Sequence, residues 1–164
     1  MNGEKIVTDR KDGDFFLMER QTPALAAKTI AELYAERLPR AYSYSPLRDI
    51  QVLCPSKKGE AGTVNLNKIL QSLVNPPSDN KNELNSGFRL FREGDKVMQI
   101  KNNYQIEWEI RTKFGLCVDK GMGIFNGDTG IIEEINDFAE TMTISFDEGR
   151  KVEYCLLYTS PSPR

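Results

Sequence analysis

The chain has 164 residues, of which 39% are hydrophobic and 28% are charged, with a formal net charge of −2 and no histidine. This composition is typical of a folded globular protein of one domain or two small ones, and no apolar run approaches the roughly 20 residues of a membrane span. The lack of histidine excludes histidine-based triads and histidine metal ligands, and three cysteines without a CxxC pair argue against a disulfide framework and a zinc site.

The N-terminal segment MNGEKIVTDRKDGD has no apolar signal-peptide core, so we expect a cytoplasmic protein with no membrane partner. The next run, residues 14–18, is short and apolar and is consistent with a strand. Thr22 and Pro23 then predict the start of a helix, as its N-cap and its first residue. Apolar residues recur at helical spacing until Pro39, where we expect this helix to end.

A second strand and helix follow the first pair. The stretch DIQVLCP, residues 49–55, is typical of a buried strand. The loop SKKGEAG connects it to a helix that we expect Thr63 to cap, with an apolar stripe on one face. NPPSDN, residues 75–80, ends that helix. The order strand, helix, strand, loop, helix indicates a parallel α/β layer.

The pattern changes at about residue 86, after a polar, loop-like segment at 80–87. FRLFREGDKVMQIKNNY alternates polar and apolar residues and turns at residues 93–95. After an ambiguous segment at 105–122, TGIIEEI, MTISFD and KVEY resemble short antiparallel strands. Strands spaced this closely predict a small β-barrel. Trp108 is the only tryptophan, and we expect it in the core rather than as a stacking platform.

Three loops could carry chemistry. The loop after the predicted strand at 49–55 places Lys57, Lys58 and Gly59 ahead of a helix N-terminus, where charges and backbone N–H groups can hold a phosphate. It contains no Walker A sequence, and an exposed basic turn is the simpler alternative. The stretch GDKVMQIKNNY, residues 94–104, ends in two amides and a tyrosine, which can contact a nucleic-acid backbone or stack on a base. The alternative is a capped turn with a half-buried tyrosine.

The third loop lies in GIFNGDTGIIEEI, residues 123–135, and turns sharply, with a positive φ expected at Gly127. A plain hairpin turn is the local explanation. Residues 126–164 carry 3 basic and 8 acidic side chains, a net charge of −5, so no basic tract for phosphate contact is visible. A nucleic-acid contact would therefore use polar, backbone and aromatic groups with a few lysines and arginines.

Four blocks in order carry a family resemblance: LRDIQVLCPSKKGEAGTVNLNKILQSLVNPP, FREGDKVMQIKNNYQIEWEI, GIFNGDTGIIEEIN and ISFDEGRKVEY. Together they resemble the C-terminal motor region of RecD-like ATP-dependent DNA helicases of superfamily 1. The resemblance implies α/β followed by all-β structure. Residues 1–85 would be part of a second RecA-like motor domain, and residues 86–154 a return strand and an SH3-like barrel. The tail CLLYTSPSPR, residues 155–164, does not match the family and is expected to be non-native.

The resemblance also implies an activity. Such helicases move 5′ to 3′ along single-stranded DNA and separate duplex DNA by hydrolysing ATP with Mg²⁺. The Walker A loop, the acidic DExx-type motif and the N-terminal motor domain are missing here. We therefore expect a fragment that has no catalytic residue, binds no metal or cofactor and is inactive alone, although the full-length protein would be an ATP hydrolase acting in DNA repair or recombination.

Site residues follow from the same resemblance. Lys57, Lys58 and Gly59 would contact nucleotide on one wall of the cleft, with Lys57 replacing an arginine that is usual in the family. A lysine keeps the charge but loses the bidentate fork. The residues expected along the DNA path are Lys96, Gln99, Asn102, Asn103, Tyr104, Asn126, Gly127 and Asp128.

Two other functions remain open from the sequence. One is a stand-alone nucleic-acid-binding β-barrel without enzymatic activity, which would not need the preceding α/β pattern. The other is a protein-interaction barrel that docks through the acidic face at 126–154. Binding of single-stranded DNA is expected of the helicase fragment and of the stand-alone module, but not of the protein-interaction barrel.

Overall fold

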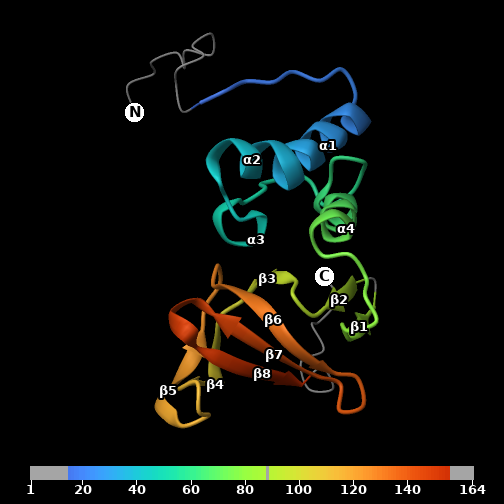
Figure 1. Ribbon diagram of the computed structural model, residues 1–164. Coiled ribbons are helices and arrows are strands. Elements are labelled where there is room, and N and C mark those ends of the chain that lie inside the picture. The colour runs from blue at the N-terminus through green and yellow to red at the C-terminus, as the bar shows by residue number, and fades with distance from the viewer. Residues whose placement is uncertain (1–14, 88, 156–164) are drawn as a thin grey trace. The chain divides into compact units, whose positions relative to one another are not determined.

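The computed structural model describes residues 15–87 and 89–155, and its contacts divide the chain into two compact units between Leu70 and Gln71 (Figure 1). Most of the tail predicted to be non-native lies outside the described residues. None of the helices in the described ranges combines the length and the hydropathy of a membrane-spanning helix. The boundary predicted at residue 85 stays a prediction.

The first unit begins with a helical run made of α1 (Pro23–Glu32), a π-helical turn η1 (Leu33–Arg37) and α2 (Leu38–Tyr42). Its predicted start is confirmed, because the Thr22 hydroxyl accepts a hydrogen bond from the Leu25 N–H at 3.2 Å. The predicted end at Pro39 is wrong. Proline lacks an N–H, and the wider π-helical turn before it accommodates that loss without stopping the helix. The run ends at Ser43, which is left-handed with φ 58°.

The rest of this unit consists of α3 (Pro46–Asp49), a loop, and most of α4 (Thr63–Val74). The predicted second helix is thus confirmed, with Thr63 as its first residue and not as the cap that precedes it. The core of the first unit is small and is formed by α1, η1 and α4. Its buried residues are Ala27, Ala31, Tyr34, Leu66 and Leu70.

The strands predicted at residues 14–18 and 49–55 are not formed. Residues 15–18 and 50–54 have no strand pairing, and Asp49 ends α3. A strand is stabilised by hydrogen bonds and burial against neighbouring strands, and here each run leaves large apolar side chains in solvent: Leu17 is 58% exposed and Leu53 is 87% exposed. The described residues of this unit are therefore a small helical part, and the predicted parallel α/β layer is absent from them.

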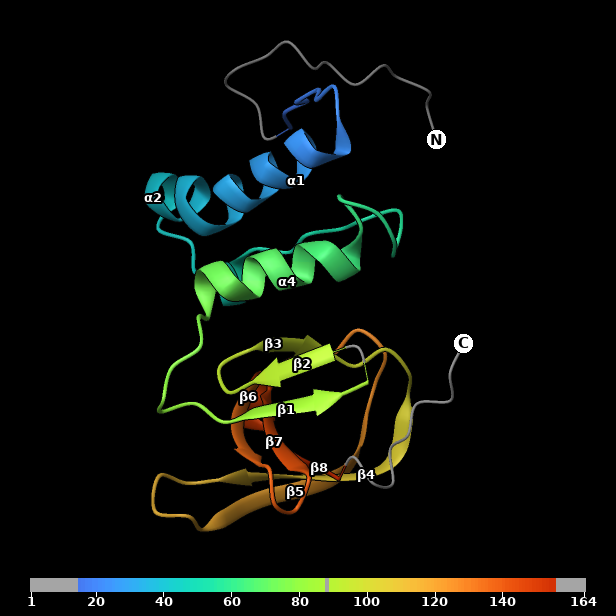
Figure 2. The same ribbon diagram turned by 90° about the vertical axis from the view of Figure 1, so that its right-hand side faces the viewer.

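The second unit is antiparallel throughout its described residues. The two-stranded sheet is β1 (Glu83–Ser86) with β2 (Arg89–Arg92), and the six-stranded sheet has the order β3-β6-β7-β8-β4-β5. The remaining elements are β3 (Lys96–Met98), β4 (Asn103–Arg111), β5 (Cys117–Ile124), β6 (Thr129–Asn136), β7 (Thr141–Phe146), the 3₁₀ turn η2 (Asp147–Gly149) and β8 (Lys151–Cys155). The ambiguous segment at 105–122 is most of the long β4–β5 hairpin (Figure 2). This arrangement is consistent with the predicted SH3-like domain.

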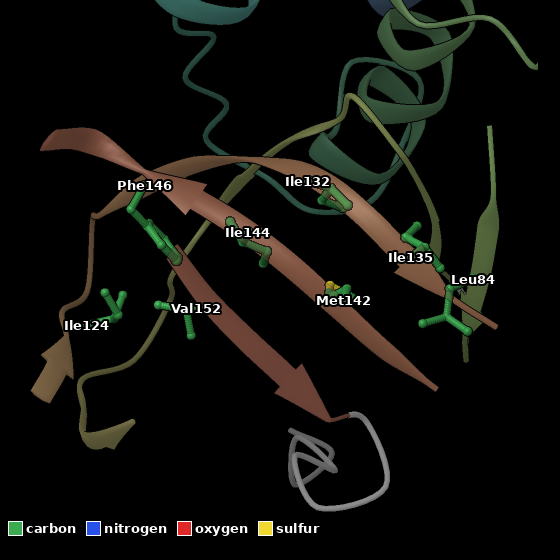
Figure 3. Packing of buried hydrophobic residues seen from close by; sticks show 8 residues of the cluster. All are labelled: Leu84, Ile124, Ile132, Ile135, Met142, Ile144, Phe146 and Val152. Atoms are coloured by element: carbon green, nitrogen blue, oxygen red, sulfur yellow. The ribbon is translucent and has the colours of Figure 1, made fainter. Parts of the chain in front are cut away.

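The core of the second unit follows from alternation along its strands. On β7, every second residue is buried, as period-2 side-chain alternation requires. Figure 3 shows the eight buried side chains of this cluster on β1, β5, β6, β7 and β8: Leu84, Ile124, Ile132, Ile135, Met142, Ile144, Phe146 and Val152. Trp108 is partly buried and packs against the cluster, at the border of the core in which it was predicted.

A buried polar network sets the position of β3. Asn75 is 3% exposed, and its amide donates to the Asp95 carboxylate at 2.7 Å and to the Glu93 carbonyl at 3.0 Å. The guanidinium of buried Arg92 donates to the Asn75 carbonyl at 2.5 Å. Gly94 then pairs with β6 through its N–H, which reaches the Ile132 carbonyl at 2.8 Å. The turn before β3 is thereby held against β6, and β3 leads into the segment described next.

Candidate nucleic-acid interface

Two segments far apart in the sequence meet beyond the end of β3. The Gln99 N–H donates to the Asp128 carbonyl at 2.9 Å, and the Gly127 N–H donates to the Gln99 carbonyl at 2.9 Å. These bonds continue the pairing of β3 with β6 past Met98. The structure therefore brings predicted DNA-binding residues of both segments together where the β3–β6 pairing ends; residues 99–104 and 125–128 are called the rim below.

The turn at residues 125–128 is fixed by its own backbone and by a carboxylate. Gly127 has φ 99°, as predicted, and an added Cβ would meet open space there, so backbone conformation alone favours glycine. The Asp128 N–H donates to the Phe125 carbonyl at 3.0 Å, and its carboxylate accepts from the Phe125 N–H at 3.1 Å. Arg150 lies 3.5 Å from the same carboxylate. Asp128 is therefore engaged within the protein and partly neutralised.

Asn102 connects the turn to Tyr104. Its side-chain oxygen accepts a hydrogen bond from the Asn126 N–H at 2.8 Å, and its amide nitrogen donates to the Tyr104 hydroxyl at 2.8 Å. Asn103 has a different position: it begins β4, and its side-chain oxygen accepts from the Gln105 N–H at 3.3 Å. Of the two predicted asparagines, Asn102 connects the two segments of the rim, and Asn103 makes a local hydrogen bond at the start of its own strand.

An exposed aromatic pair lies on the rim. The rings of Tyr104 and Phe125 meet edge to face, with centroids 5.7 Å apart and an interplanar angle of 68°. Tyr104 is 65% exposed and Phe125 is 44% exposed, so the alternative of a half-buried tyrosine does not describe Tyr104. Phe125 lies over Gly123, where an added Cβ would stand 3.2 Å from the ring. Gly123 also has φ 99°. A glycine suits this position for two reasons: it adopts the positive φ readily, and it has no Cβ that would crowd the ring of Phe125.

The side chain of Gln99 is held by a hydrogen bond from Tyr154. The Tyr154 hydroxyl donates to the Gln99 side-chain oxygen at 3.0 Å, and the Gln99 amide donates to the Lys101 carbonyl at 2.6 Å. Burial, and then the negative charge of Asp128, raise the pKa of Tyr154 to about 12. The phenol therefore stays neutral and keeps donating at ordinary pH.

Positive charge at the rim is sparse. Lys96 is partly buried on β3 and pairs with Ile131, two residues further from the turn than Met98. Lys101 is exposed between Gln99 and Asn102, within the rim segment itself. Sequence reasoning did not select Lys101, Phe125, Arg150 or Tyr154. Lys101 and Phe125 adjoin predicted residues, whereas no local signal distinguishes Arg150 and Tyr154.

The predicted nucleotide contacts lie in the loop before α4. Lys57, Lys58 and Gly59 are exposed, and Gly59 has φ 94°. Two N–H groups at the start of α4 are already used inside the loop, since Thr63 donates to the Ser56 carbonyl at 3.1 Å and Val64 to the Lys57 carbonyl at 3.2 Å. A phosphate here would have to be held by the lysine side chains and other loop N–H groups.

Comparison with known proteins bears on the second unit. No solved structure matches the chain. Residues 66–146 match the family model described as the SH3 domain of ATP-dependent RecD-like DNA helicases, and this range contains all the residues predicted along the DNA path. The match supports a RecD-like, helicase-associated domain in this chain, with nucleic acid as the class of partner.

Proposed function

We propose that the chain is a fragment of an ATP-dependent 5′–3′ DNA helicase, and that the rim lies on the path of its single-stranded DNA. The observation that supports this most is the convergence of residues 99–104 and 126–128 inside the region that matches the helicase SH3 domain. A groove for single strands combines aromatic faces with a few cations, and Tyr104, Phe125 and Lys101 are groups of that kind.

The first unit would belong to the second of two RecA-like motor domains. In the complete protein, residues 14–18 and 49–55 would pair with strands that the described residues do not include, and this would cover side chains such as Leu17 and Leu53. Lys57, Lys58 and Gly59 would contact ATP on one wall of the cleft. The Mg²⁺ site and the catalytic carboxylate would come from the N-terminal motor domain.

Stepping follows from closing and opening of the cleft between the two motor domains. The γ-phosphate of ATP would favour the closed state, and hydrolysis would release it. The grip on DNA would alternate between the domains, while the rim guides the strand. The fragment alone therefore should show no ATPase activity.

A stand-alone nucleic-acid-binding module is the second candidate, because the second unit has its own hydrophobic core. Such a module would bind strands as the fragment does, so the two candidates are separated by joining the chain to a RecD-like N-terminal motor domain. DNA-stimulated ATP hydrolysis by the joined protein would favour the helicase, and its absence would favour the module.

Binding is tested with a fluorescently labelled oligothymidylate and anisotropy over a series of salt concentrations. We expect weak binding that falls as salt rises, because lysine contacts release counterions. Lys101→Gln should weaken it and reduce the salt slope, whereas Lys113→Gln, an exposed lysine between β4 and β5, should not. Absence of binding at low salt, or ATP turnover by these residues alone, would refute the proposal.

A further inference from the structure

We infer that Tyr104 and Phe125 form a platform on which an unpaired nucleobase stacks, and that Asn102 positions this platform instead of contacting DNA. The inference rests on the proposed function, but it specifies the chemistry of recognition: the ring faces bind bases of any sequence.

The first reason is the exposure of the two rings. An exposed aromatic ring on a folded domain gains little from burial, yet two such rings meet here in a defined edge-to-face contact. Phe125 is supported on one side by the backbone at Gly123, which is itself buried. Ile100, which is 61% exposed, adds apolar surface in the same segment. A planar apolar ligand would cover the ring faces that solvent now contacts.

The second reason is that the rim amides are already engaged. Both ends of the Asn102 amide are bonded within the protein, to Asn126 and Tyr104. Both ends of the Gln99 amide are bonded too, to Tyr154 and Lys101. Reading a base edge would require these amides to break internal hydrogen bonds, at a cost comparable to the gain. Stacking requires no such exchange and tolerates any base.

The third reason is the role that these bonds give to Asn102. Its oxygen holds the turn that carries Phe125, and its nitrogen holds the hydroxyl of Tyr104. One side chain thus fixes both halves of the aromatic pair. The carboxylate of Asp128 should repel a DNA phosphate only weakly, because the guanidinium of Arg150 lies beside it and offsets its negative charge.

The test compares two labelled probes, an oligothymidylate of about 12 nucleotides and an abasic strand of equal length, which share charge but differ in bases. The full chain should bind the oligothymidylate about 5- to 150-fold more tightly, as expected for one stacked base. Tyr104→Leu should remove most of this preference, while Tyr104→Phe, which keeps the ring but loses the hydroxyl bonded to Asn102, should retain most of it. Phe138→Leu, at a fully exposed aromatic in the β6–β7 turn, is the matched control and should leave it unchanged.

Asn102→Ala separates positioning from direct contact. A positioning residue should weaken binding of the oligothymidylate several-fold and leave binding of the abasic strand unchanged. Equal weakening of both strands would mean that Asn102 contacts the sugar–phosphate backbone and would overturn its assignment. Equal affinity of the unmodified chain for both probes, with Tyr104→Leu binding normally, would overturn the platform but not the DNA path. Failure to bind either probe would refute the proposed function itself.

Discussion

Gly121→Ala tests the packing of the β4–β5 hairpin against the core. Gly121 pairs with Trp108 across the two strands, and an alanine Cβ there would stand 2.4 Å from Trp108 Cζ2 and 2.8 Å from Cε2. Ordinary contact begins at 3.4 Å, so the indole would have to withdraw by about 1 Å. Trp108 packs against the hydrophobic cluster, and the displacement would therefore disturb the core.

The expected loss in the free energy of unfolding is about 1–3 kcal/mol, as for an overpacked core. Alanine restricts the unfolded chain more than glycine, but that gain of about 0.5–1 kcal/mol does not reverse the sign. For a unit of this size, the midpoint of thermal unfolding should fall by roughly 4–20 °C.

The assay is thermal unfolding followed by tryptophan fluorescence, which reports on this site directly because Trp108 is the only tryptophan. Lys120→Ala, at the adjacent exposed position on β5, is the control and should change stability by less than about 0.5 kcal/mol. Trp108→Phe should make the alanine better tolerated, so the two changes should not be additive. An unchanged midpoint for Gly121→Ala would refute the contact.

Three further predictions concern the second unit. The pKa of Tyr154 is raised to about 12 in the folded chain, whereas a tyrosine in the unfolded chain ionises near pH 10, so the free energy of unfolding should fall across about pH 10–12. Urea titrations at several pH values should show that Tyr154→Phe lacks this part of the decrease. An equal decrease in both proteins would contradict a buried phenol. Asn75→Ala should cost about 1–3 kcal/mol in urea unfolding because the Asp95 Oδ1 and the Glu93 carbonyl lose the amide that donates to them, whereas Asn80→Ala at an exposed position should cost almost nothing. Tyr104→Ala in a completed helicase should slow unwinding in a strand-separation assay without lowering the thermal midpoint, and normal unwinding would remove Tyr104 from the DNA path.

Some of the fold was predictable because its causes are local. Thr22 and Pro23 start a helix through contacts within one turn, and the positive φ at Gly127 follows from the residues of the turn itself. The short runs TGIIEEI and MTISFD between polar turns likewise identified β6 and β7. Such features require no knowledge of distant residues.

Other predictions failed, or could not be made, because their causes are not local. The apolar runs at 14–18 and 49–55 resemble strands, but a strand forms only by pairing with another strand, and their described residues form none. The stop expected at Pro39 did not account for a π-helical turn.

By itself, the sequence determined which residues turn, which alternate, and which segments carry amides and aromatics. Only the tertiary structure decided how those groups are used. It joined Gln99 to Tyr154, and Asp128 to Arg150, across long stretches of chain, and it engaged the amide of Asn102 with Asn126 and Tyr104 while leaving the ring of Tyr104 in solvent. The physical reason is that a hydrogen-bonding group acts through the partner it reaches, and that partner is set by strand register.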